Sequence, residues 1–229
     1  MAAAACRLEA AIDLPLDGIA VSADVRTFHR YSMGVSTLAG IEDTGAWPED
    51  APGLSYYQMT EAALDELAGH GRVDAVYFTA SVPDCQVSQF LSQLVARRLT
   101  PLPHVLGLTD QGPVATFTAL RLARRRIETG EAERAAVLVL EHRMFPSAVD
   151  LGRDAADRAV LLVLGTGPGR PVESVRIATG RQPQQDSTLV APAAVWAALA
   201  RAPENEPMRL TGHDPGTGLA GEAVFGART

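Results

Sequence analysis

Two uninterrupted apolar runs constrain the fold of this 229-residue chain more than any other feature. AAVLVLE (135–141) and RAVLLVLG (158–165) lack the alternation of apolar and polar residues that marks a half-exposed strand. Continuous apolar strands are typical of sheets that are covered on both faces. The two runs therefore predict a sheet that lies between layers of helices.

Helical segments alternate with strands from residue 55 onward. Ser55 and Gln58 form a capping box, and the apolar stripe behind them ends at Gly69. Further helices are predicted through Phe90–Val95 and from Pro113 to Gly130, since proline suits the first helical position. Further strands are predicted at 73–80, 104–109 and 172–179. This order predicts an α/β domain with a largely parallel or mixed sheet.

The pattern is weaker after residue 180. RQPQQDST (181–188) is polar and resembles a linker, and one helix is predicted at about 191–201. Two short strands, MRLTG (208–212) and EAVFG (222–226), complete the prediction.

Composition excludes several classes of function. The net charge of −7 argues against nucleic acid binding, which needs a basic face. No apolar run reaches the length of a membrane span, and Arg7 and Glu9 interrupt the alanine-rich start before a signal peptide can develop. The two cysteines, Cys6 and Cys85, have no pairing or metal-ligand spacing. We therefore expect a cytoplasmic protein without a metal or other cofactor.

The chain contains no lysine and only one asparagine. All 20 basic residues are arginine, so a Schiff-base lysine or a phosphate-loop lysine is excluded. The single asparagine, Asn205, lies in the Pro/Glu-rich stretch APENEP.

Several segments together resemble β-ketoacyl-ACP synthase III and its thiolase-fold relatives. VDAVYFTASVPD (73–84) is similar to that family's strand and Pro-Asp turn, and 118–143 to the helix after the nucleophile and the following strand. DAADRAVLLVLG (154–165) and LTGHDPGTGLAGEAVFG (210–226) resemble a later strand and the glycine-rich closing hairpin. The resemblance implies a thiolase-like, layered α-β-α sheet. It also implies that residues 1–180 keep most of the N-terminal half, while 181–229 are a reduced C-terminal half of one compact domain.

The family's catalytic residues have no counterpart here. Members use Cys, His and Asn, and the resemblance places Pro113 at the position of the cysteine. Residues 105–120 contain no Cys or Ser, only three threonines, and no family motif surrounds Asn205. Because proline cannot accept an acyl group, the resemblance implies that the family's mechanism does not operate at this site.

Other residues are candidates for a different chemistry. His213 could act as a base with Asp214 beside it, although adjacent side chains seldom pair and Asp-Pro-Gly is a common turn. Asp110 and Glu141 are further candidate bases. Cys85 follows a Pro-Asp turn, but a structural thiol is the simpler interpretation. GTGLAG (216–221) has no following helix, so a dinucleotide site is rejected.

Arg124, Arg125 and Arg126 form a run of basic residues on an acidic chain. The run could bind an acyl carrier protein or phosphopantetheine, while a solvated helix face is the simpler interpretation.

These patterns favour a non-catalytic subunit that pairs with a cysteine-bearing ketosynthase III-like partner in acyl or polyketide-type metabolism, as a hetero- or homo-oligomer. Half of a thiolase fold would leave a strand edge and apolar surface to cover. Two alternatives stay open: a small acyl-thioester enzyme without a covalent cysteine intermediate, and a carrier-protein-binding scaffold.

Overall fold

A computed structural model describes residues 5–19, 53–80, 84, 90–109, 111–142, 156–179, 192–214 and 217–228. The strands are β1 (Arg7–Asp13), β2 (Ala75–Ala80), β3 (His104–Leu108), β4 (Arg134–Glu141), β5 (Arg158–Gly165), β6 (Arg170–Thr179), β7 (Met208–Asp214) and β8 (Leu219–Phe225). The α-helices are α2 (Tyr56–Leu67), α3 (Leu91–Arg98), α4 (Ala115–Glu128) and α5 (Pro192–Arg201), and the short 3-10 helices are η1 (Ala68–His70) and η2 (Gly112–Val114).

The strands join in the order β3-β2-β4-β5-β1-β6-β8-β7. β2 is parallel to β3 and β4, whereas β5 is antiparallel to both β4 and β1. β1 and β6 are paired only at Arg7–Pro171 and Leu8–Arg170. The sheet therefore has two parts, a five-stranded part and the three-stranded part β6-β8-β7.

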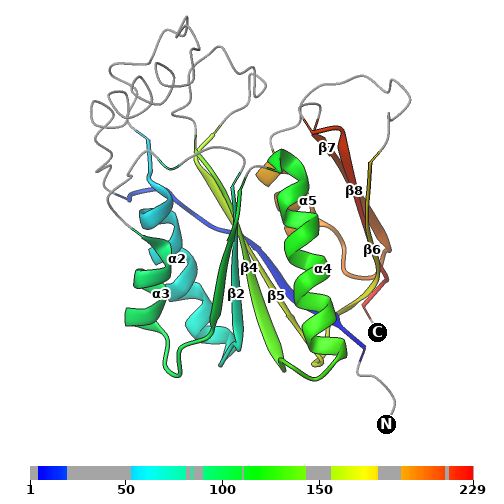
Figure 1. The fold of residues 1–229 in the computed structure, drawn as a ribbon, viewed down its shortest axis with the longest axis horizontal. Helices are drawn as coiled ribbons and strands as arrows, with labels where there is room; N and C mark the ends of the chain where they lie inside the picture. Colours follow the sequence, from blue (N-terminus) through cyan, green and yellow to red (C-terminus); the bar gives the residue numbers. More distant parts are fainter. Residues whose placement is uncertain are drawn as a thin grey trace, which may run out of the picture.

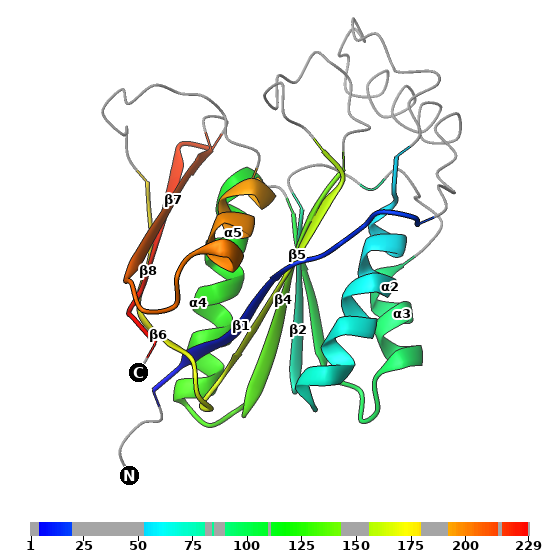
Figure 2. The ribbon, with the colours of Figure 1, turned by 180° about the vertical axis from the view of Figure 1, so that it is seen from behind.

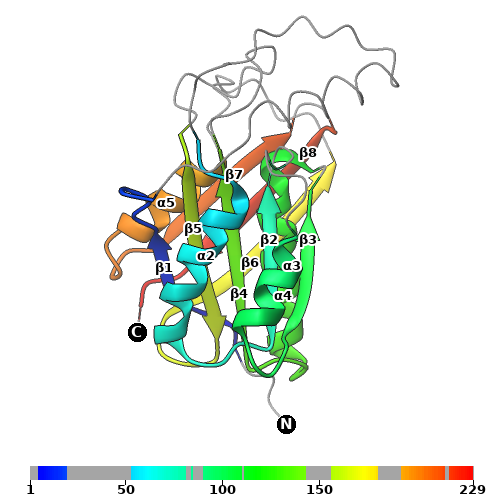
Figure 3. The same ribbon diagram turned by 90° about the vertical axis from the view of Figure 1, so that its left-hand side faces the viewer.

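Helices fill the space on both sides of the five-stranded part (Figure 1). Helices α2 and α3 cover one face, and Figure 3 shows them in front of the sheet with β3 at its edge. Helices α4 and α5 lie between the other face and β6-β8-β7, which Figure 2 shows from behind. The predicted α-β-α core is present, and the closing hairpin with β6 adds a fourth layer.

Alternate residues of β4 enter two different hydrophobic cores. Ala135, Val137 and Val139 pack with α4 and α5. Ala136, Leu138 and Leu140 pack with α2 and α3. Both faces of the strand are buried, which explains why the sequence shows a continuous apolar run there.

Most predicted elements lie where the sequence placed them. Ser55 caps α2 and forms the predicted capping box with Gln58. GTGPG (165–169) forms the connection between β5 and β6. The helix predicted from Pro113 begins as η2 before it continues as α4. Strand β1 was not predicted at all.

Strand β1 is held in place by charged side chains, and these interrupt the apolar pattern by which a strand is predicted from a sequence. Glu9 accepts a hydrogen bond from Arg134 Nε (2.7 Å) and another from the Gly167 N–H (2.8 Å). Arg7 donates to the Gly169 carbonyl at 2.9 Å. These partners make it possible for a strand that carries Arg7 and Glu9 to lie between β5 and β6.

We predict that Gly169→Ala lowers the free energy of unfolding by about 2 kcal/mol, because overpacking against backbone cannot relax easily. An added Cβ would overlap the Leu8 carbonyl and lie 2.9 Å from the Glu9 Cα. Urea unfolding measures the effect, and Gly69→Ala is the matched control because no atom lies within 4 Å of its Cβ position. Equal stabilities of the two variants would contradict the close approach of β1.

Candidate functional site

The starts of α4 and α5 lie at the same end of the molecule, where β2 and β4 end (Figures 1 and 2). The Thr79 hydroxyl at the end of β2 lies 2.9 Å from the Thr116 hydroxyl in the first turn of α4. Thr79 Oγ1 also donates to the Leu138 carbonyl on β4 (3.2 Å). Because both threonines are buried, this network fixes the start of α4 on the sheet.

Pro113 lies in η2, at the entry to α4. Before it, Gln111 accepts a hydrogen bond from the Thr118 hydroxyl (2.6 Å). Gly112 has a φ of +48°, a conformation that favours glycine. The position that the resemblance assigns to a nucleophile thus holds a residue with neither a reactive group nor an N–H.

The carboxylate of Asp214 lies against Gly112. A Cβ placed on Gly112 would lie 3.1 Å from Asp214 Cγ and 3.3 Å from its Oδ1. Asp214 also accepts a hydrogen bond from the Thr217 hydroxyl (2.6 Å), and its carbonyl accepts one from the Gly218 N–H (2.8 Å). A negative charge is favourable near a helix N-terminus, so Asp214 occupies the place where that end would attract an anion.

We predict that Gly112→Ala lowers the free energy of unfolding by about 1–2 kcal/mol, because a side chain at positive φ is strained. The added methyl group would also press on the Asp214 carboxylate. Urea unfolding of Gly112→Ala with and without Asp214→Ala separates the two causes. A cost that is unchanged by Asp214→Ala would leave backbone strain as the whole effect.

Two glycines bring the β7–β8 hairpin onto α4. Gly212 and Gly221 are directly paired across the hairpin, and both face Phe117. A Cβ on Gly221 would lie 2.5 Å from Phe117 Cδ2, and one on Gly212 would lie 2.8 Å from Cε2. Phe117 packs in turn on Trp196 of α5, with ring centroids 5.0 Å apart. The glycines thus allow the hairpin to cover the start of α4.

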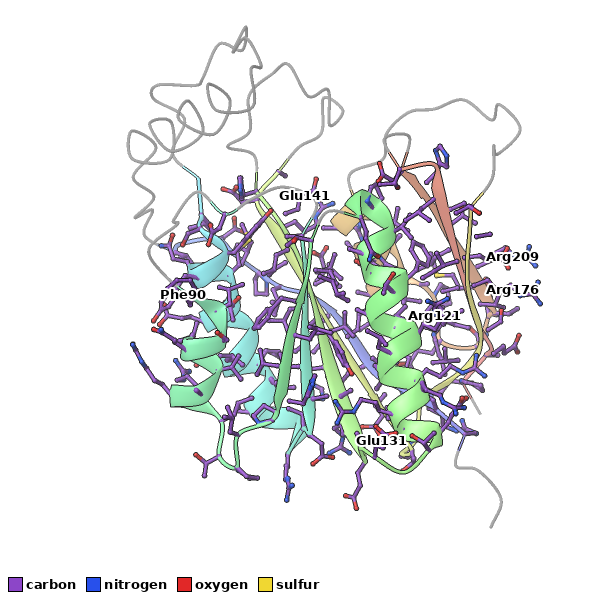
Figure 4. All side chains as sticks on the ribbon, in the orientation of Figure 1. Phe90, Arg121, Glu131, Glu141, Arg176 and Arg209 are labelled. Carbon is purple, nitrogen blue, oxygen red and sulfur yellow. The ribbon has the colours of Figure 1, made fainter. Side chains whose placement is uncertain are left out.

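His213 and Asp214 lie on opposite faces of β7. Successive side chains of a strand alternate, and Gly212 and Asp214 face α4 and η2. His213 therefore belongs to the outer face, with Arg209, which pairs with Glu222 at 3.2 Å. Figure 4 shows Arg209 and Arg176 on that outer side. The candidate base His213 is not brought to the start of α4, and the candidate Asp110 lies outside the described residues.

Glu141 is a buried acid at the end of β4. Its side chain is 4% exposed, and its Oε2 accepts a hydrogen bond from the Ala193 N–H (2.9 Å) in the first turn of α5. Its Oε1 has no hydrogen-bond partner among the described residues. Burial raises the pKa of Glu141 to about 7, although Ala193 and Arg158 act in the opposite direction. A carboxyl group in this state can donate or accept a proton near neutral pH.

The three consecutive arginines point in different directions because helical residues are 100° apart. Arg124 pairs with Glu128 (2.6 Å) and donates to the Glu173 carbonyl on β6 (3.0 Å). Arg126 lies near Tyr77 and Glu131, while Arg125 is exposed in the last turn. Two of the three therefore have partners within the chain.

The cysteines offer no nucleophile in the part that the structure describes. Cys6 is buried, and burial raises the pKa of its thiol to about 12, so it is a thiol at neutral pH. Cys85 lies outside the described residues. Within those ranges no group of three or more His, Cys, Asp or Glu side chains could hold a metal ion. Nor is any helix there long and apolar enough to cross a membrane.

No protein-family model matches the sequence, and no curated protein matches it either. Solved structures do. ChlB3, described as an acyltransferase, aligns with a TM-score of 0.64 at 14% identity over 98% of each chain. The fold is that of thiolase-like, ketosynthase III-type proteins.

Two further thiolase-like structures agree. The 3-oxoacyl-(acyl carrier protein) synthase III of Xanthomonas oryzae pv. oryzae has a TM-score of 0.57 at 13% identity, over 98% of this chain and 99% of that one. AbyA1, a tetronic acid condensing enzyme, has a TM-score of 0.58 at 13% identity, over 96% and 99%. These alignments extend over almost the full length of both chains, so they do not show the predicted shortening, which stays a prediction.

The most informative contacts at the entries to α4 and α5 were not predicted from the sequence. Asp214 was considered only as a partner of His213, and Glu141 was considered as a candidate base but not as a buried carboxyl group that contacts the start of α5. Gly212 and Gly221 were a usable signal in the sequence, because they lie at equal distances from the hairpin turn and so pair with each other. Paired glycines on one face of two neighbouring strands indicate that another element packs closely on that face.

Proposed function

We propose that this chain is a non-catalytic, ketosynthase III-like subunit that pairs with a cysteine-bearing condensing partner in acyl or polyketide-type metabolism. One observation carries the proposal: η2, which leads into α4, holds Pro113 and lies against the Asp214 carboxylate at Gly112. The solved structures described as a synthase III and as a condensing enzyme support the link to acyl-thioester chemistry.

The chemistry of acyl transfer explains why this geometry disfavours catalysis. Attack on a thioester needs a nucleophile and donors that stabilise the developing oxyanion. Pro113 supplies neither. An oxyanion near Gly112 would also meet the negative charge of Asp214 instead of an unoccupied helix N-terminus. Retention of the fold without these groups favours a role in assembly.

The edge at β3 is the surface that we assign to the partner. β3 is the last strand on its side of the described sheet, so one side of its backbone has no neighbouring strand there. The most exposed large apolar side chains among the described residues flank α3 and β3: Leu102 is 64% exposed and Phe90 is 61% exposed. Figure 4 shows Phe90 on the outer side of α3. A second thiolase-like sheet could continue from this edge.

The pairing is tested by co-expression with a cysteine-bearing ketosynthase III-like chain encoded beside this one. We expect one stable mixed complex in size-exclusion chromatography with light scattering. Phe90→Glu combined with Leu102→Glu should weaken it at least tenfold, because buried charge is costly at an interface. Leu122→Glu on α4, where Leu122 is 36% exposed, is the matched control. No mixed complex with the wild-type chain would overturn the proposal.

A small acyl-thioester enzyme is the second candidate, and Glu141 is the observation that favours it. The carboxyl is buried beside the start of α5, with a pKa of about 7, which suits an acid or base. This candidate requires turnover of an acyl-thioester by the purified chain alone. Glu141→Gln should then reduce kcat at least a hundredfold, while a chain without turnover would exclude it.

A further inference from the structure

The contact between Glu141 and α5 joins two layers of the fold through one buried acid. Glu141 Oε2 accepts the Ala193 N–H at 2.9 Å, and Oε1 lies buried without a hydrogen-bond partner among the described residues. Figure 4 shows Glu141 at the end of the central strands. An ionised carboxylate needs several donors when it is buried, whereas a neutral carboxyl group needs fewer.

The charges around Glu141 do not compensate a buried carboxylate. Arg158 faces it across β4 and β5, but its Nε also lies 3.8 Å from an Asp13 carboxylate oxygen on β1. The first turns of α4 and α5 carry no charged residue: the arginines of α4 begin at Arg121, and the one basic residue of α5 is Arg201 in its last turn. His142, the next residue, packs its ring on Tyr56 of α2, with centroids 4.7 Å apart. Arg158 is therefore the one cation that acts on the carboxyl group from the described elements.

We propose that Glu141 and the first turn of α5 form a pH-dependent contact: the neutral carboxyl group holds α5 on β4, and loss of its proton loosens the start of α5. The neutral group accepts the Ala193 N–H without burying a charge. After ionisation, the carboxylate gains free energy by reaching water, and this requires the start of α5 to move from the end of β4.

The proposal goes beyond the pairing function because it concerns the conformation of the site. α5 begins at the same end as α4, and Trp196 of α5 packs on Phe117 of α4. If the start of α5 moves, the packing of Trp196 on Phe117 changes, and the start of α4 is then held less firmly. Acidic conditions would keep this end of the molecule closed, and a rise of the pH to neutral would favour its opening.

Hydrogen exchange of the intact chain, followed by mass spectrometry and corrected for intrinsic exchange rates, tests the contact. The exchange of the peptide that covers the start of α5 gives an equilibrium constant for local opening. In wild type this constant should rise about tenfold per pH unit between about pH 5 and about pH 7, and then level off. In Glu141→Gln, which keeps an acceptor oxygen for Ala193, it should be flat. The α2 peptide is the internal control.

A second readout keeps the proposal open to refutation if Glu141→Gln folds poorly. In wild type, one infrared band of a protonated carboxyl group should persist above the ordinary pKa of glutamate and disappear only near neutral pH. A band that titrates as in an exposed glutamate would overturn the proposal. So would an α5 pH dependence that persists in Glu141→Gln, because His142 or another group would then be responsible.

Discussion

Phe117→Ala is expected to lower the free energy of unfolding by about 3–5 kcal/mol. Phe117 is 1% exposed and packs on Trp196, Gly212 and Gly221, so its ring joins α4, α5 and the β7–β8 hairpin. Truncation would leave a cavity where three elements meet. Urea unfolding followed by circular dichroism measures the loss. A cost near 1 kcal/mol would show that the hairpin does not depend on this ring.

Gly221→Ala provides the matched comparison. In the wild-type background the added methyl group meets the Phe117 ring, and overpacking should cost about 2–3 kcal/mol. In the Phe117→Ala background the same methyl group enters the cavity, so its cost should fall below about 1 kcal/mol. The two changes are therefore strongly non-additive in a double-mutant cycle. Additive costs would contradict the direct contact.

The contribution of Glu141 to the stability of the chain should decrease as the pH rises from about 4.5 to about 7, by on the order of 3 kcal/mol. Burial raises the pKa of Glu141 to about 7, so the folded state holds this proton more tightly than the unfolded state. The stabilisation that this proton gives the folded state is complete below the ordinary pKa of a glutamate. It is lost as the pH rises to the pKa that Glu141 has in the folded state. The loss arises because the buried carboxylate lacks sufficient partners.

Urea unfolding of wild type and Glu141→Gln across this pH range isolates the effect. We expect the difference in stability between the two proteins to change with pH in favour of Glu141→Gln at higher pH, since only wild type buries an ionisable group there. The other carboxyl groups act equally in both proteins and cancel. A pH-independent difference would mean that Glu141 stays in one protonation state.

The central strands could be predicted from the sequence because a strand that is buried on both faces has apolar residues throughout its length. β4 and β5 have apolar residues at nearly every position, and each alternate set enters its own core. Ser55 and Gln58 predicted the start of α2 because a capping box uses only local contacts. Features with a local physical cause were therefore predictable.

Strand β1 and the contacts at the site depend on residues far apart in the chain. Glu9 is acceptable in an inner strand only because Arg134 and Gly167 approach it. Likewise, Asp214 reaches Gly112 only because two glycines allow the hairpin to lie on Phe117. No local pattern contains these partners. The alternation of strand side chains could nevertheless have separated His213 from Asp214 in advance.

The start of α4 is expected not to accept an acyl group, and intact mass spectrometry after incubation with an acyl-thioester tests this expectation. Acetyl-coenzyme A and a longer acyl-coenzyme A serve as probes, with a cysteine-bearing synthase III as the positive control. We expect an unmodified mass for this chain under conditions that acylate the control. A stoichiometric acyl adduct on one residue at the end where α4 and α5 begin would contradict it.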